Sequence, residues 1–162
     1  DLYDALGVNG LRNNSAVNVI KLSKQYCSDY SLLRQKLSDD YENKISYQTD
    51  NVGSLACHEL GHAIHKILAM KRANIKYGEV LSPIKRLAFE RELQKIKTEI
   101  YLSAFTNEEL EEIDEICFNE LGGMTYRNPD ELIAQSFGNY YYGKTKSRVG
   151  NAIVNYFKKE LA

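Results

Sequence analysis

Apolar side chains recur every three or four residues along most of the chain, which is the spacing of one face of an α-helix. The predicted helices run from Ser15 to Tyr26, through Leu32 and Leu37, from Asp50 or Asn51 to about Arg72, over 82–104, from Thr106 to before Gly122, from Asn128 to Tyr142, and from Ser147 to Leu161. Residues 1–14 are rich in glycine and asparagine and predict a loop. Ile45–Thr49 alternates between apolar and polar residues, which fits a short strand and an ordinary loop equally well. The pattern therefore predicts a mainly α (α+β) fold with at most a small sheet.

Helix start signals support several of these boundaries. Ser82 and Asn128 each precede a proline, and a capping residue followed by proline in the first turn is typical of a helix N-terminus. Thr106 and Glu109 have the spacing of a capping box, and Ser147 could cap the last helix. We expect a helix to begin at each of these four positions.

The composition limits the number of domains and the kinds of partner, but it does not indicate a function. A chain of 162 residues, 43% apolar and 27% charged, is expected to form one domain spanning 1–162. The net charge of -1 gives no reason to expect nucleic acid or a membrane surface as a partner, and no apolar run is long enough to cross a bilayer. The three cysteines have no metal-type spacing and are expected to be small buried residues. Because the sequence begins with Asp1, we expect it to be a piece of a longer polypeptide.

Candidate chemistry lies in the third predicted helix, in the stretch His58-Glu59-Leu60-Gly61-His62. Residues four apart lie one above the other on a helix, so the two imidazoles can bind one metal ion, and zinc accepts such ligands. Glu59 lies further round the helix, where its carboxylate can accept a proton from a water at the metal; this is the H-E-x-x-H arrangement of zinc peptidases. A five-residue pattern also arises by chance. Here it holds two of only three histidines and lies in a largely apolar helix, and Gly61 is an unfavourable mid-helix residue whose retention suggests close approach by another segment.

A catalytic zinc needs a third protein ligand. His65 is unsuitable, because seven residues separate it from His58 and place it about 10 Å further along the helix axis; we expect it to hydrogen-bond or pack beside the site. Glu131 is a better candidate, although its spacing from Asn128 is equally that of a capping box. The spacing alone does not decide between these roles.

The stretch Thr125-Tyr126-Arg127-Asn128-Pro129-Asp130-Glu131, followed by Ala134 and Phe137, resembles the C-terminal protease domain of anthrax lethal factor and its relatives, which are zinc metallopeptidases of the gluzincin type with a zincin-like fold. The resemblance covers roughly 50–70 and 120–160. It implies that Glu131 is the third zinc ligand and that Tyr126 stabilises the oxyanion. The gap from tyrosine to glutamate is shorter here by about two residues, and the interval from His62 to Glu131 is longer by about the helix at 82–104.

The residues Leu55-Ala56-Cys57-His58-Glu59-Leu60-Gly61-His62 are also similar to the ImmA/IrrE-type peptidases of mobile elements, whose corresponding interval is much shorter. Both families use a glutamate as third ligand. The resemblances leave the compartment open, with a secreted or a mobile-element-encoded parent protein as the two settings they suggest.

These observations predict a zinc-dependent endopeptidase acting on a protein or peptide, with zinc held by His58, His62 and Glu131. Glu59 is the expected general base, and Tyr126 or one of Tyr140–Tyr142 the expected oxyanion donor. The alternative is a non-catalytic zinc-binding or assembly module with a degenerate protease fold. A closed structural zinc site usually includes cysteine, and no cysteine is suitably placed, which favours the enzyme.

Overall fold

Helix α3 (Gly53–Arg72) carries the candidate motif and packs against elements on several sides. The computed structural model describes residues 7–12, 14–46 and 51–162. In chain order they form β1 (Gly7–Leu11), β2 (Asn18–Leu22), α1 (Lys24–Cys27), α2 (Tyr30–Glu42), α3, α4 (Pro83–Ala104), the 3-10 turn η1 (Asn107–Glu109), α5 (Ile113–Leu121), the 3-10 turn η2 (Gly123–Thr125), α6 (Pro129–Tyr142) and α7 (Arg148–Leu161). The described residues are thus mainly helical with a small antiparallel sheet, which confirms the α+β class.

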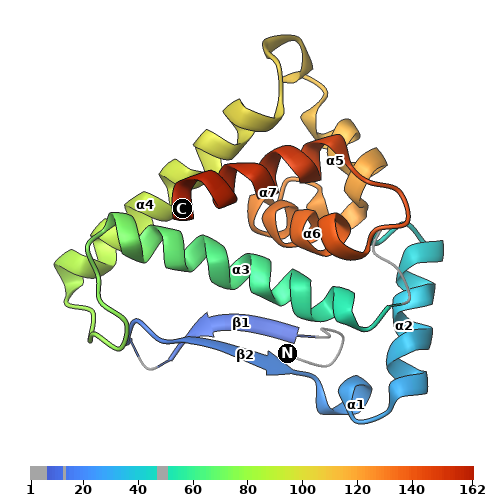
Figure 1. Ribbon diagram of the computed structural model, residues 1–162, viewed down its shortest axis with the longest axis horizontal. Helices are drawn as coiled ribbons and strands as arrows, with labels where there is room; N and C mark the ends of the chain where they lie inside the picture. Colours follow the sequence, from blue (N-terminus) through green and yellow to red (C-terminus); the bar gives the residue numbers. More distant parts are fainter. Residues whose placement is uncertain (1–6, 13, 47–50) are drawn as a thin grey trace.

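The main core lies where α3, α4, α6 and α7 meet. Figure 1 shows α6 and α7 on one side of α3 and the β1–β2 hairpin along another. The side chains at the centre of this core are almost fully buried: Leu68, Ile96, Ile100, Leu132, Ile133, Ile153 and Phe157. Burying side chains of this size contributes roughly 1.5–3 kcal/mol each. The two helices that carry the candidate ligands, α3 and α6, are therefore held together by this buried core.

The predicted helix starts are confirmed in three places. The side chains of Ser82, Asn128 and Ser147 accept hydrogen bonds from backbone N–H groups in the first turns of α4, α6 and α7. Thr106 and Glu109 do form the predicted capping box, but it opens only the short turn η1, and α5 begins later. The helix predicted to start at Thr106 is therefore shorter than expected.

The prediction for the N-terminal region was wrong. Gly7–Leu11, placed in a loop, forms β1, and the helix predicted from Ser15 contains β2 and then the single turn α1. The two strands pair antiparallel, with Gly7 opposite Leu22. The side-chain amide of Asn18 donates to the carbonyl of Ala63 on α3 over 3.3 Å. Short apolar runs do not separate helix from strand by period alone, and here pairing with β1 and packing on α3 decide the outcome.

The segment Ile45–Thr49 lies only partly within the described residues. Ile45 and Ser46 are not in a strand, and 47–49 lie outside the described ranges. The backbone N–H groups of Gly123 and Met124 donate to the carbonyls of Lys44 and Ile45 over 2.8 and 3.1 Å. The described part of this segment therefore supports the loop interpretation, and its hydrogen bonds connect it to the turn before α6.

Exposure differs from expectation at a few positions. Leu60 and Ile67 on α3 are 42% and 45% exposed, so one side of this helix faces outward among the described residues. Of the cysteines, Cys117 is buried as predicted, whereas Cys27 and Cys57 are only half-buried. Within the described ranges, no helix has the length and apolar character that crossing a membrane requires.

Candidate metal centre

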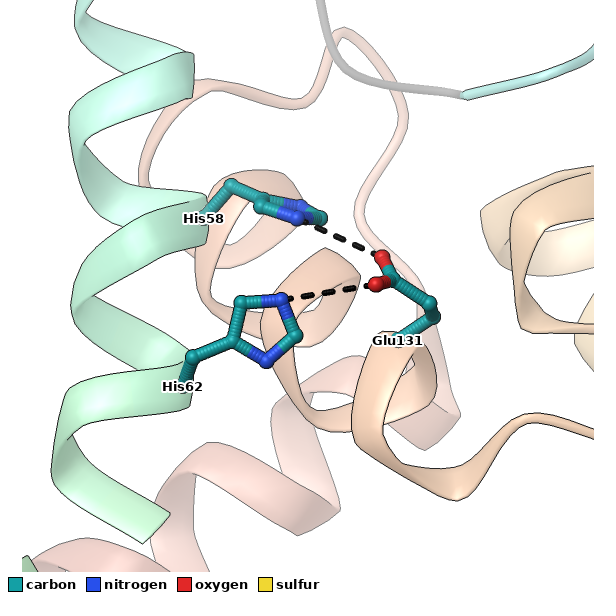
Figure 2. Close-up of side chains that lie close together, drawn as sticks. All are labelled: His58, His62 and Glu131. Atoms are coloured by element: carbon teal, nitrogen blue, oxygen red, sulfur yellow. Dashed lines mark ion pairs between the residues drawn. The ribbon is translucent and has the colours of Figure 1, made fainter. Parts of the chain in front are cut away.

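Two histidine side chains of α3 face the N-terminal turn of α6. His58 and His62 are one helical turn apart, and their ring centroids lie 5.0 Å from each other with the ring planes nearly perpendicular. Figure 2 shows both rings directed from α3 toward the carboxylate of Glu131 on α6. The four-residue spacing thus places both imidazoles on one face of the helix, as predicted.

Glu131 reaches this pair from the first turn of α6. Its Oε2 atom lies 3.3 Å from His58 Nε2, and its Oε1 atom lies 3.5 Å from His62 Nε2. The backbone N–H of Glu131 donates to the side chain of Asn128 over 3.3 Å. Asn128 therefore caps α6 through the backbone of Glu131, while the Glu131 carboxylate, which a capping box would direct back at Asn128, points at the histidines instead.

The separations of these atoms suit a small metal ion. One ligand atom from each of His58, His62 and Glu131 can be chosen so that all three lie within 4.8 Å of one another. Ligand atoms at 2.0–2.1 Å from a tetrahedral zinc are about 3.3 Å apart, close to the observed distances from imidazole to carboxylate. The His–His–Glu group could therefore hold a metal ion.

The charge of Glu131 also fits a metal ligand. Burial works to raise the pKa of this carboxyl, but its contacts with His58 and His62 outweigh burial and hold the pKa at about 2. Its Oε2 atom is buried and, among the described residues, has no well-formed hydrogen bond. Burying an ionised oxygen that lacks a well-formed hydrogen bond costs free energy. A bound cation would offset that cost.

Glu59 lies beside the histidines and is almost fully buried, with 2% of its surface exposed. Burial raises the pKa of its carboxyl, opposed first by the charges of His58 and His62, while Glu131 raises the pKa further. Its Oε2 atom is buried with no hydrogen-bond partner among the described residues. A raised pKa and an unsatisfied buried oxygen beside candidate metal ligands are typical of a group that exchanges protons.

The third histidine, His65, is not a member of the metal group and makes polar contacts beside it, as predicted. Its Nδ1 atom lies 3.3 Å from Asp130 Oδ1, and its Nε2 atom lies 3.3 Å from the carbonyl oxygen of Leu93. Asp130 also accepts from Lys97 over 2.7 Å. The hydrogen bond with His65, together with that of Lys97 and against the effect of burial, holds the pKa of Asp130 well below its usual range.

Sequence reasoning missed two basic residues near the centre. Lys97, on α4, has no sequence feature that sets it apart from the other charged residues of its helix, but its side chain is only 16% exposed. Lys66, one turn beyond His62, lies close enough to Asp130 and Glu59 for their charges to oppose the effect of burial, which lowers its pKa. The spacing of Lys66 from His62 was the one available signal; nothing in the sequence pairs Lys97 with Asp130.

Among the described residues, Tyr126 makes no hydrogen bond, ion pair or ring contact with the metal group. Tyr126 lies five residues before Glu131 in the chain. It is 53% exposed, and the guanidinium of Arg127 lies over its ring. Among the alternatives, Tyr140 accepts a hydrogen bond from Lys158, and Tyr141 is exposed. Tyr142 lies against Gly53 at the start of α3. The oxyanion assignment therefore stays a prediction.

Comparison with known proteins gave no match to this chain among protein-family models, curated protein sequences or solved structures. The resemblances to the lethal factor and ImmA/IrrE families therefore stay predictions from short motifs. The geometry of His58, His62, Glu131 and Glu59 carries the functional argument.

Proposed function

We propose that this protein is a zinc-dependent endopeptidase that hydrolyses a protein or peptide, with a zincin-like catalytic fold. The proposal rests chiefly on one observation: His58, His62 and Glu131 converge from two helices while a buried carboxylate, Glu59, lies beside them. The set of two imidazoles and one carboxylate is the donor set of catalytic zinc sites that keep a position open for water.

Bound zinc would lower the pKa of a water toward about 7 and polarise the carbonyl of the bond to be cleaved. Glu59 accepts the proton of the attacking water and passes it to the leaving amine. Tyr126, or Tyr142 at the other end of α6, donates a hydrogen bond to the carbonyl oxygen as negative charge develops there. The metal would be held by His58, His62 and Glu131. These three side chains take no part in the proton transfers of the reaction.

The test begins with metal content. Wild-type protein, Glu131→Ala and the control Glu111→Ala, which removes an exposed carboxylate, are purified identically and analysed for bound metals. We expect about one zinc per chain in the wild type and the control, and its loss in Glu131→Ala. Zinc retained in full by Glu131→Ala would exclude Glu131 as a ligand.

Hydrolysis is tested with a mixed peptide library analysed by mass spectrometry, using zinc-loaded wild type and Glu59→Gln. We expect new peptide termini with the wild type, and cleavage slower by about 10²–10⁴-fold with Glu59→Gln at unchanged zinc content. Cleavage at equal rates by both proteins would exclude Glu59 as the general base. Zinc binding without any cleavage of peptides or unfolded proteins would instead favour the non-catalytic module.

A further inference from the structure

The carboxylate of Asp130 bridges three helices directly beside the candidate metal ligand Glu131. One of its oxygens contacts His65 of α3 at 3.3 Å, and the other accepts from Lys97 of α4 at 2.7 Å. Asp130 itself belongs to the first turn of α6. The start of α6 is therefore attached to α3 and to α4 through one side chain.

The two partners of Asp130 are fixed more firmly than Asp130 itself. The side chains of His65 and Lys97 are 3% and 16% exposed, whereas that of Asp130 is 47% exposed. The His65 ring packs edge-on against Phe157 and contacts the carbonyl of Leu93 as well as Asp130. Because a carbonyl and a carboxylate only accept hydrogen bonds, His65 donates to both when each ring nitrogen carries a proton.

The carboxylate of Glu131, by contrast, contacts only His58 and His62 by ion pairing within the described residues. Those imidazoles are the other candidate ligands, so their contacts with Glu131 would give way to bonds to the metal once an ion is held. Its placement has to come from the backbone of the first turn of α6, where the N–H groups lack partners within the helix. Asn128 satisfies one of them, and the Asp130 bridge supplies a second attachment.

The contacts also fix the register of α6 on α3. His58 and His62 face Glu131, and His65, three residues beyond His62 on the same rigid helix, holds the adjacent Asp130. We propose that His65 and Lys97 act through Asp130 as positioning residues, which hold Glu131 where its carboxylate and the two imidazoles can bind one metal ion. This inference rests on the metal site of the proposed function but not on hydrolysis.

The competing explanation is that the bridge only stabilises the fold. A matched control separates the two, because Glu99 of α4, two residues after Lys97, forms a comparable ion pair with Arg72 near the end of α3. Glu99→Gln removes a charge between the same two helices without touching the metal group. Asp130→Asn removes the charge of the bridge at nearly constant size, and Lys97→Met removes one of its two arms.

The probe is Co²⁺ alone, added to metal-free full-length chain and followed by its visible absorption, with thermal unfolding recorded for each variant. We expect Asp130→Asn to weaken Co²⁺ affinity by about 10–100-fold and to alter the absorption spectrum, as loss of outer-shell partners does elsewhere. We expect a smaller loss for Lys97→Met. Glu99→Gln should lower the unfolding temperature yet leave affinity and spectrum unchanged.

Three outcomes would count against part or all of this account. Folded Asp130→Asn with wild-type affinity and spectrum would overturn the positioning role and leave the metal site standing. Equal losses of affinity in Asp130→Asn and Glu99→Gln would show that the bridge acts only through stability. A wild type that binds no Co²⁺ and no zinc would overturn both the positioning role and the proposed function.

Discussion

Gly61 of α3 lies directly against Ala134 of α6. A Cβ atom built on Gly61 would come within 2.8 Å of the Ala134 Cα atom, and within 3.1 and 3.3 Å of atoms of Phe137 and Ile133. Real Cβ atoms essentially never come within 3.0 Å of such an atom, so the contact with the Ala134 backbone excludes a side chain at Gly61 unless the helices move. The absence of a side chain at Gly61 is thus what lets α6 come near enough for Glu131 to reach the histidines of α3.

We therefore predict that Gly61→Ala weakens metal binding. Alanine favours a helix over glycine by about 1 kcal/mol, but the contact with backbone forces α3 and α6 apart, and overpacking of this kind costs roughly 1–3 kcal/mol. The net result should be lower stability and at least tenfold weaker metal affinity, measured by denaturant unfolding and by Co²⁺ titration.

The control is the same substitution at Gly150 of α7, where the nearest atoms to an added Cβ belong to the Ser147 side chain, at 3.3 Å or more. Gly150→Ala should leave metal affinity unchanged. If Gly61→Ala bound metal as tightly as the wild type, the close approach would not be what assembles the site.

The sequence predicted the parts of this site that local chemistry specifies. The pair His58 and His62 follows from helix geometry, and the start of α6 follows from Asn128 and its neighbouring proline. Gly61 was predicted to permit close approach because a mid-helix glycine is locally unfavourable, and the contact with Ala134 confirms this. Each of these signals is readable within a few residues of the chain.

The features that the sequence did not predict depend on partners far along the chain. The residues of β2 suit a helix or a strand, and pairing with β1 together with packing on α3 selects the strand. The contact between Asp130 and Lys97 joins residues 33 positions apart. Neither partner carries a local signal of the other, so periodicity and capping rules could not find these contacts.

We predict that metal affinity is lost at acid pH because the imidazoles take up protons, and not because Glu131 does. The pKa of Glu131 is held at about 2, so this carboxylate stays ionised from pH 5 to pH 8. Protons compete with a metal for imidazole nitrogen. Zinc affinity should therefore fall as the pH is lowered, by up to about 100-fold per pH unit where both histidines must lose a proton, in competition titrations against a chelator.

Glu131→Gln provides the matched variant for this measurement. Since Glu131 binds no proton in the range, its replacement should weaken zinc affinity at every pH without changing the slope. A slope that became shallower in Glu131→Gln would mean that this carboxylate titrates with the histidines, contrary to its low pKa.

Tyr126→Phe tests the oxyanion assignment. If the Tyr126 hydroxyl donates to the developing oxyanion, its removal should lower kcat by about 10²–10³-fold while zinc content stays at the wild-type level. Because the side chain is 53% exposed, the substitution should barely change stability. Tyr142→Phe, assayed in parallel, identifies the donor if Tyr126→Phe retains full kcat.

We predict that the buried charge of Glu59 destabilises the metal-free protein at neutral pH. Burial raises the pKa of Glu59, so folding favours its protonated form, and above the unfolded pKa of about 4.3 the charged carboxylate destabilises the native state. Glu59→Leu should therefore stabilise the metal-free protein by about 1 kcal/mol at pH 7, and this gain should largely vanish near pH 4. Urea unfolding with chelator present measures both values. A loss of stability at pH 7 would show that the Glu59 carboxylate is well solvated or paired, which would remove the physical reason for assigning it the role of general base.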